Sequence, residues 1–82
     1  MGAASEAFLE MLAAERGAAV NTLTAYRRDL EGAEEIVGNL ADAGREDVAR
    51  LAAAWSSLAP STVARKSSAL RQFFTFALDE GW

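Results

Sequence analysis

Side chains that could bind phosphate gather near the C-terminal end of this sequence. Three basic residues and no acidic one lie between positions 59 and 78, and two hydroxyl side chains precede the cations. This set consists of Ser61, Thr62, Arg65, Lys66 and Arg71. Guanidinium, ammonium and hydroxyl groups all donate hydrogen bonds to phosphate oxygens. The stretch therefore indicates a helix face that could bind anions. From these residues alone, the alternative interpretation is a solvated helix face that binds nothing.

A second group of similar residues lies at positions 21–28. Its members are Asn21, Thr22, Arg27 and Arg28, and acidic residues follow directly. The two arginines could pair with Glu31 and Glu35 at helical spacing, but each such pair contributes only about 0.2–0.5 kcal/mol. Phosphate groups could therefore compete with these carboxylates for the arginines.

The whole chain is acidic, which by itself argues against a nucleic-acid partner. Twelve acidic and eight basic residues give a net charge of −4, whereas free-standing nucleic-acid binders are usually basic. The acids lie outside the C-terminal basic stretch, at positions 6–15, 29–35, 42–47 and 79–80. We expect them to form a solvated surface that faces away from a bound anion, so that a negative chain can still carry a locally positive face.

The residue types that most often act as general bases or metal ligands are missing. The chain has no cysteine and no histidine, which excludes a thiolate site and removes the commonest general base and metal ligand. Its single tyrosine, Tyr26, falls on an apolar helix stripe. We expect no catalytic residue, no metal and no cofactor. No apolar run approaches the ~20 residues that cross a bilayer, so we expect a soluble, cytoplasmic protein without a membrane partner.

Four helices are expected to position these residues, roughly over positions 4–16, 21–37, 46–57 and 61–79. Glycine or proline residues separate them. Asn21 is the expected N-cap of the second helix, and Ser61 or Thr62 that of the fourth. Alanine is abundant, valine, isoleucine and aromatic residues are sparse, and no hairpin turn signal occurs. The sequence therefore predicts one all-α domain, a compact four-helix bundle.

Apolar residues at spacings of three and four define the expected core side of each helix. Along the chain they are Phe8, Leu9 and Leu12, then Leu23, Tyr26, Leu30, Ala33 and Val37, then Val48, Leu51, Ala52 and Trp55, and finally Val63, Leu70, Phe74 and Ala77. Each set covers one face of its helix, so the four faces are expected to meet in a shared core.

The remaining residues of the last helix are expected to lie at different distances from the core. The side opposite the core carries Ser61, Arg65, Ser68 and Gln72. Lys66 and Arg71 flank the apolar stripe, where their stems can lie along the surface with their charges outward. Ser67 points toward the core and would need a hydrogen-bond partner there. Phe76 lies off the main arc and is expected to pack on the first helix or on a further domain.

Two longer motifs resemble the tyrosine site-specific recombinase and phage integrase family. Residues 21–30, Asn-Thr-Leu-Thr-Ala-Tyr-Arg-Arg-Asp-Leu, are similar to the opening motif of its N-terminal domain, in which serine or asparagine and a threonine precede a tyrosine, a basic pair and Asp-Leu. Residues 61–74 resemble its fourth helix, where a hydroxyl-rich start leads to basic residues and Ser-Ala-Leu-Arg-x-Phe. Ser67 departs from the branched aliphatic residue common there. The resemblance spans nearly the whole chain. Within the family, the sequence is most similar to the Xer branch and is XerD-like.

The resemblance implies a SAM-like four-helix domain, the N-terminal half of a C-shaped clamp around duplex DNA. In such recombinases the second and fourth helices enter the major groove and contact the backbone beside it. Carried to this sequence, the candidate DNA contacts are Thr22, Tyr26, Arg27, Arg28, Ser61, Thr62, Arg65, Lys66 and Arg71. Tyr26 is expected to serve core packing more than direct contact. The charge distribution alone points to the same two helices.

The resemblance also implies binding partners and a separate catalytic domain. Family members cleave DNA with a tyrosine in a separate C-terminal catalytic domain, and this chain ends at Trp82, before such a domain begins. We therefore expect residues 1–82 to be the core-binding domain of a recombinase fragment, without enzymatic activity, from a protein for site-specific recombination, DNA integration or chromosome dimer resolution. The implied partners are double-stranded DNA, the catalytic domain and other protomers in a tetrameric synapse. The isolated domain is expected to be a monomer that binds DNA weakly.

Two other interpretations belong to different functional classes. An acidic, alanine-rich helical module that binds proteins would show no duplex binding at low salt and an exposed apolar patch as its working surface. A catalytic function would need a nucleophile–base pair or a metal-ligand cluster, and neither occurs in the sequence. The target DNA sequence, and the choice between a chromosomal Xer-type enzyme and a phage or plasmid integrase, stay open at this level.

Overall fold

Helices make up most of the chain in a computed structural model, which describes all residues from Met1 to Trp82. They are α1 (Ala3–Glu15), α2 (Val20–Val37), α3 (Arg45–Ala54) and α4 (Pro60–Asp79), with a short 3₁₀ helix, η1 (Leu40–Asp42), between α2 and α3. No strand is present. The predicted all-α, four-helix architecture is confirmed.

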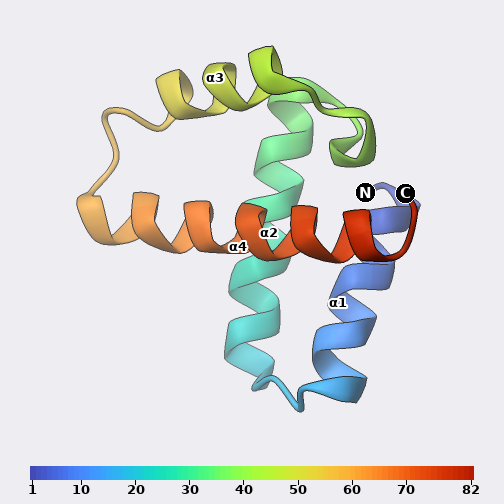
Figure 1. The fold of residues 1–82 in the computed structure, drawn as a ribbon. Coiled ribbons are helices and arrows are strands. Elements are labelled where there is room, and N and C mark those ends of the chain that lie inside the picture. The colour runs from blue at the N-terminus through green and yellow to red at the C-terminus, as the bar shows by residue number, and fades with distance from the viewer.

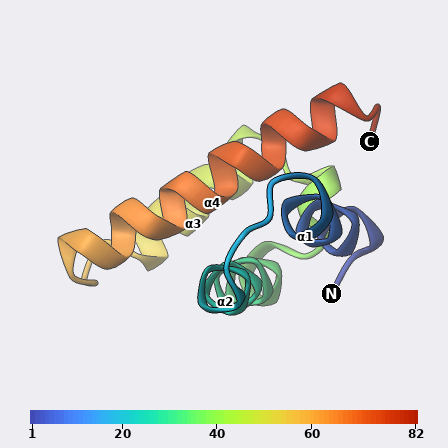
Figure 2. The ribbon, with the colours of Figure 1, turned by 90° about the horizontal axis from the view of Figure 1, so that it is seen from below.

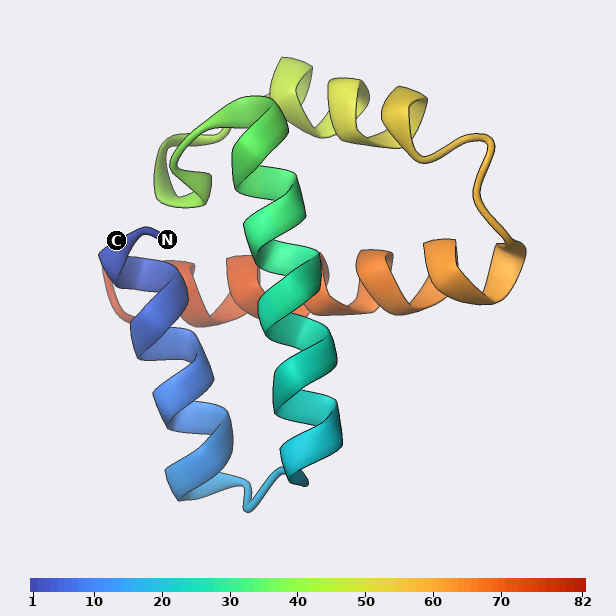
Figure 3. The same ribbon diagram turned by 180° about the vertical axis from the view of Figure 1, so that it is seen from behind.

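The four helices form two pairs, α1 with α2 and α3 with α4, and the two pairs cross each other. α1 and α2 run antiparallel, α4 lies across both, and α3 runs beside the first half of α4 (Figure 1). Seen from below, α4 lies on one side of the α1–α2 pair (Figure 2). Seen from behind, α2 extends past α4 to reach α3, and the two chain ends lie near each other (Figure 3). α4 therefore meets α2 midway along its length and α1 near its C-terminal end.

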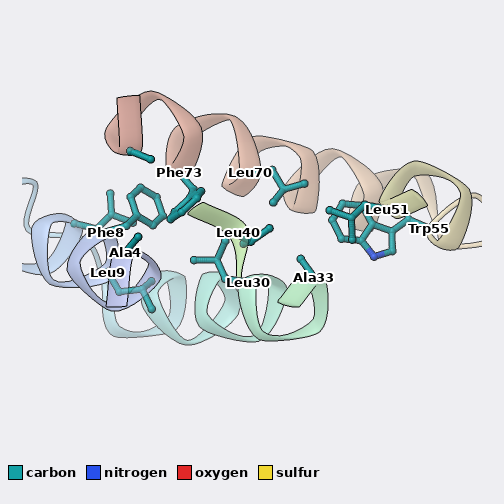
Figure 4. Close-up of a cluster of buried hydrophobic side chains, with 12 residues drawn as sticks. Ala4, Phe8, Leu9, Leu30, Ala33, Leu40, Leu51, Trp55, Leu70 and Phe73 are labelled. Atoms are coloured by element: carbon teal, nitrogen blue, oxygen red, sulfur yellow. The ribbon is translucent and has the colours of Figure 1, made fainter. Parts of the chain in front are cut away.

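The core lies between α4 and the α1–α2 pair (Figure 4). Its fully buried large side chains are Phe8, Leu30, Leu40, Leu51 and Phe73. Phe8 meets Phe73 edge-on with ring centroids 5.8 Å apart, and the Phe76 ring lies 5.7 Å from Phe8. Such aromatic pairs add to the stabilisation that comes from buried area. The second contact confirms that Phe76 packs on the first helix.

The predicted core face of α3 is only half covered. Leu51 and Trp55 are buried as predicted, but Val48 and Ala52 are exposed. Helical periodicity marks an apolar stripe, whereas the neighbouring helices determine how much of that stripe is covered. Here α3 packs on α2 with one edge and leaves the other edge open toward α4.

The core face of α4 is rotated relative to the prediction. Its buried residues are Ala69, Leu70, Phe73 and Ala77. Val63 and Phe74, both predicted to face the core, are half-buried and line a groove beside α3. Ser67, also predicted to point toward the core, is exposed at the same groove. The rotation follows from the position of α2, which covers the side of α4 that the sequence assigned to solvent.

The predicted N-caps of two helices are wrong. α2 begins one residue before Asn21, which therefore lies inside the first turn. α4 begins at Pro60, and neither Ser61 nor Thr62 caps it. Proline suits the first helical position because its φ is already helical and it has no N–H to leave unpaired. α3 ends at Ala54, before the predicted position 57.

Glu34 joins three parts of the chain. Its carboxylate accepts hydrogen bonds from the backbone N–H of Gly2 and of Leu40, both at 3.2 Å. An acid that was expected to be solvated thus fixes the N-terminus and η1 against the end of α2. The connection after α2 depends on Gly38, whose φ of 82° lies in the left-handed region that favours glycine.

Candidate nucleic-acid interface

A buried ion-pair cluster lies where α4 crosses α2. The Asp29 side chain is only 2% exposed, and it accepts two hydrogen bonds from Arg65, from Nε at 2.9 Å and from Nη2 at 2.8 Å. This bidentate contact raises the pKa of Arg65, because the carboxylate stabilises the charged guanidinium group. Asp29, which the sequence assigned to a solvated acidic run, instead joins two helices through a charged contact.

Lys66 completes this cluster. Its ammonium group donates to Asp29 Oδ1 at 3.2 Å and lies 5.3 Å from the centre of the Trp55 ring. The Lys66 side chain is 16% exposed, so the prediction of an outward charge is wrong for this residue. One carboxylate faces two cations, and the cluster therefore keeps one net positive charge where α4 crosses α2.

Tyr26 and Gln72 form a second polar contact between α2 and α4. Gln72 Nε2 donates to the Tyr26 hydroxyl at 3.0 Å and to Ser68 Oγ at 3.1 Å. Tyr26 is half-buried and packs against the core, which confirms the packing part of its predicted role. Gln72 and Arg65 were expected to lie opposite the core, but both occupy the edge of α4 that faces α2.

Arg27 points away from the crossing and toward α1. Its Nη1 and Nη2 donate to the two carboxylate oxygens of Glu6 at 2.9 and 3.1 Å. The predicted pairing with Glu31 or Glu35 is therefore wrong for Arg27, because its side of α2 faces α1. The hydrogen bonds raise the pKa of Arg27 and lower the pKa of Glu6. The two side chains are 45% and 43% exposed, so solvent screens the pair.

The other candidate contacts have no acidic partner. They are Thr22, Arg28 and Ser61, which are exposed, Thr62, which is half-buried, and Arg71, which is exposed. Arg28 directly precedes Asp29 on α2, and its charge is free for an external anion. Arg71 lines the groove beside α3, whereas Arg65 contacts α2 on the other edge of α4. The nine candidates therefore do not form one continuous patch.

Two members of this site were missed from the sequence, Asp29 as a buried partner and Gln72 as a contact between helices. Asp29 could have been found, because it lies three residues after Tyr26 and four before Ala33 on the buried stripe of α2. Gln72 gives no comparable signal, since its partner Tyr26 is 46 positions away. The same is true of Lys66 and its aromatic neighbour Trp55.

An open apolar groove lies between α3 and the first half of α4. Its volume is about 340 Å³, and its lining includes Val48, Trp55, Val63 and Phe74, with Arg71 at one side. Val48 is 42% exposed. The groove is the kind of exposed apolar surface that the protein-interaction hypothesis predicts.

Two further properties concern metals and membranes. No group of three or more histidine, cysteine, aspartate or glutamate side chains is arranged so that it could bind a metal ion. None of the helices combines the length and the apolar character needed to cross a bilayer.

Comparisons with known proteins identify relatives along the whole fold. A family profile described as "Phage integrase, N-terminal SAM-like domain" matches residues 6–81. The chain is 70% identical over 79 residues to tyrosine recombinase XerC of Erythrobacter litoralis, covering 96% of this chain and 26% of the relative. It is 46% identical over 84 residues to tyrosine recombinase XerD of Caulobacter vibrioides, covering 95% and 28%, and 51% identical over 85 residues to XerD of Brucella abortus, covering 96% and 28%. No solved structure matches the chain.

These matches decide the family on two grounds. The profile begins within α1 and ends after α4, so it includes every helix described above. The relatives include both XerC and XerD, which confirms the predicted likeness to the Xer branch. The chain spans about a quarter of the length of these curated relatives. It belongs to the tyrosine recombinase and phage integrase family, within the N-terminal SAM-like domain.

Proposed function

We propose that residues 1–82 bind duplex DNA as the N-terminal half of the C-shaped clamp of a tyrosine recombinase. The observation that carries this proposal is the crossing of α2 and α4, where Arg65 of one helix contacts Asp29 of the other. The crossing brings together the two segments with the phosphate-binding residue types. Arg65 at the crossing and the cations and hydroxyls elsewhere on the two helices can then contact DNA phosphates.

The local charges support an anionic partner despite the acidic chain. The Asp29 cluster keeps one net positive charge, and Arg28, the residue before Asp29 on α2, is exposed and has no carboxylate partner. Thr22 and Ser61 add exposed hydroxyls on the same two helices. The Arg27–Glu6 pair is exposed and weak, so a phosphate could replace the carboxylate at Arg27. Lys66 contributes long-range charge more than a direct contact, because little of it is exposed.

The wider role of the protein is proposed from its relatives, which are named tyrosine recombinases XerC and XerD. In that role the protein performs site-specific recombination or DNA integration in the cytoplasm. Residues 1–82 form its core-binding domain and supply no catalytic residue, so DNA cleavage takes place in another part of the protein. The partners are double-stranded DNA, the catalytic domain and other protomers of a tetrameric synapse.

Fluorescence anisotropy with a short labelled duplex, repeated across salt concentrations, tests DNA binding. About four phosphate contacts would give a log–log salt slope near −3.6. Arg28→Gln removes a cation that has no partner in the protein, so the fold is not disturbed. We expect this variant to bind more weakly and to lose about 0.9 of the slope, the value of one phosphate contact.

Arg45→Gln is the matched control. Arg45 is also exposed and also has no ion-pair partner, but it lies at the start of α3, away from the α2–α4 crossing. We expect its salt slope to equal that of the wild type. Equal losses for both variants would contradict a DNA-binding face at the crossing. If a folded sample shows no binding at ~50 mM salt, the titration is repeated with the rest of a recombinase restored, and continued absence of binding would reject the proposal.

The groove between α3 and α4 favours a second candidate function, binding of another protein. Apolar residues exposed in a contiguous patch often mark interaction surfaces. A Val48→Asp variant would introduce charge at the groove while leaving the α2–α4 crossing unchanged. If the anisotropy titration of this variant matches wild type, the groove does not take part in DNA binding and stays available for contact with another protein.

A further inference from the structure

We infer that Asp29 is a positioning residue for DNA binding, which orients the guanidinium group of Arg65 so that its free edge is presented to a phosphate. The inference rests on the proposed function. Asp29 itself is buried and cannot touch DNA. It acts through Arg65, which is the only side chain of the cluster with substantial exposure, at 46%.

The hydrogen-bond pattern determines which edge of Arg65 is free. Asp29 accepts from Nε and from Nη2, so one edge of the planar guanidinium group faces the carboxylate. A guanidinium group carries more N–H donors than this contact uses, and the unused donors lie on Nη1 and Nη2. These N–H groups are arranged to donate to two oxygens of one phosphate in a second bidentate contact. Arg65 can therefore bind Asp29 and DNA at the same time.

Lys66 and Trp55 make the arrangement rigid. Lys66 donates to the same Asp29 oxygen that accepts from Arg65 Nη2, and its ammonium lies over the Trp55 ring. The carboxylate of α2 is thereby held by two side chains of α4, one of which lies against Trp55 at the C-terminal end of α3. An arginine that is already ordered loses less conformational entropy when it binds a ligand than a free arginine does. The cluster therefore prepares Arg65 for binding.

Charge alone predicts the opposite effect of Asp29. A carboxylate beside a phosphate-binding surface repels DNA, so its removal would strengthen binding if Asp29 had no role beyond charge. A purely structural carboxylate would leave the affinity of the folded protein unchanged or slightly higher. The positioning role predicts weaker binding when the carboxylate is neutralised, and this sign separates it from the other two cases.

The test is the affinity of the Asp29→Asn variant for a short duplex of random sequence, measured by anisotropy at constant salt on protein shown to be folded by circular dichroism. We expect about tenfold weaker binding, the equivalent of one charge-assisted hydrogen bond. The control is Glu35→Gln, which removes the same charge from an exposed position of α2 and should bind DNA as tightly as wild type or slightly more tightly. Unchanged or tighter binding by Asp29→Asn would overturn the inference.

Two more variants test whether Asp29 acts through Arg65. In an Arg65→Gln background, Asp29→Asn should cause no further loss, whereas a second loss of similar size would overturn the inference. Arg65→Lys keeps the charge and a partner for Asp29, but an ammonium group has no second edge to present. We expect it to bind about tenfold more weakly as well, and wild-type affinity would overturn the inference even if Asp29→Asn fails to fold.

The outcomes also separate this inference from the proposed function. If wild type and Glu35→Gln bind the duplex and Asp29→Asn binds equally well, DNA binding stands and the positioning role fails. If no folded variant binds, including the wild type with the rest of a recombinase restored, the proposed function fails and the inference fails with it.

Discussion

The two halves of α4 are attached to the molecule by different forces. The C-terminal half is fixed by aromatic packing, since Phe73 is fully buried and meets Phe8 edge-on. The N-terminal half is fixed by charged hydrogen bonds from Arg65 and Lys66 to Asp29, while its apolar side borders an open groove. The half that stands away from the core also carries most of the candidate DNA contacts of α4, so polar attachment and surface chemistry coincide there.

The largest expected difference lies between two faces of the C-terminal half, with Phe73 on the core face and its neighbour Phe74 at the groove. Phe73→Ala should lower the free energy of unfolding by about 3–5 kcal/mol, because a full aromatic volume is lost from the core. A domain of this size has only about 4–12 kcal/mol in total, so the variant should be largely unfolded at moderate temperature. Phe74→Ala, at the half-buried groove, should cost about 1–2 kcal/mol. Urea unfolding followed by circular dichroism measures both, and equal losses would contradict the distinction between the packed core face of α4 and its open groove face.

A smaller effect is expected when the charged attachment is broken. Asp29→Ala leaves Arg65 and Lys66 without an acceptor and should lower the free energy of unfolding by about 2–3 kcal/mol. The loss stays below that of a fully buried pair because Arg65 is partly exposed. Glu35→Ala, on an exposed position of the same helix, should change stability by no more than about 0.5 kcal/mol. Thermal unfolding of both variants measures these losses. Equal losses of stability would refute the role of Asp29 in attaching α4 to α2.

The smallest effect is expected at the exposed pair between Glu6 and Arg27, and it should depend on pH. The hydrogen bonds to Arg27 lower the pKa of Glu6 in the folded state. A lowered folded pKa means that the pair stabilises the fold above the ordinary pKa of 4.5 and that this contribution disappears as the pH falls through the lowered value. Unfolding midpoints of wild type and Glu6→Gln should therefore differ slightly at neutral pH and converge in acid. A difference that persists in acid, or that is unaffected by added salt, would show that Glu6 acts by other means.

Much of the fold could be predicted because its signals are local. Glycine and proline separate the helices, and stripes such as Leu30 and Ala33 repeat at helical spacing, so four helices and most of their buried residues were correct. The N-caps were wrong because Pro60 and a residue before Asn21 begin their helices without a capping side chain. The rotation of α4 was missed because periodicity cannot tell which part of an apolar stripe a neighbouring helix will cover.

The candidate site likewise has features that the sequence predicts and contacts that it does not. Residue type and position alone marked the cations and hydroxyls of α2 and α4, and the spacing of Asp29 relative to Tyr26 and Ala33 held enough information to predict its burial. The partners of these residues could not be predicted. Arg27 has acidic neighbours along its own helix, yet it pairs with Glu6, 21 positions away, because the facing helix presents a better-placed carboxylate.

By itself the sequence determined the helices, the separation of acidic from basic residues and the family, since each of these depends on residue order and local spacing. Only the tertiary structure decided that Asp29 pairs with two cations of α4, that Lys66 lies over Trp55 and that Arg65 and Arg71 occupy opposite edges of one helix. The physical reason is that a helix sequence determines which residues share a face, whereas the crossing of two helices determines what that face meets.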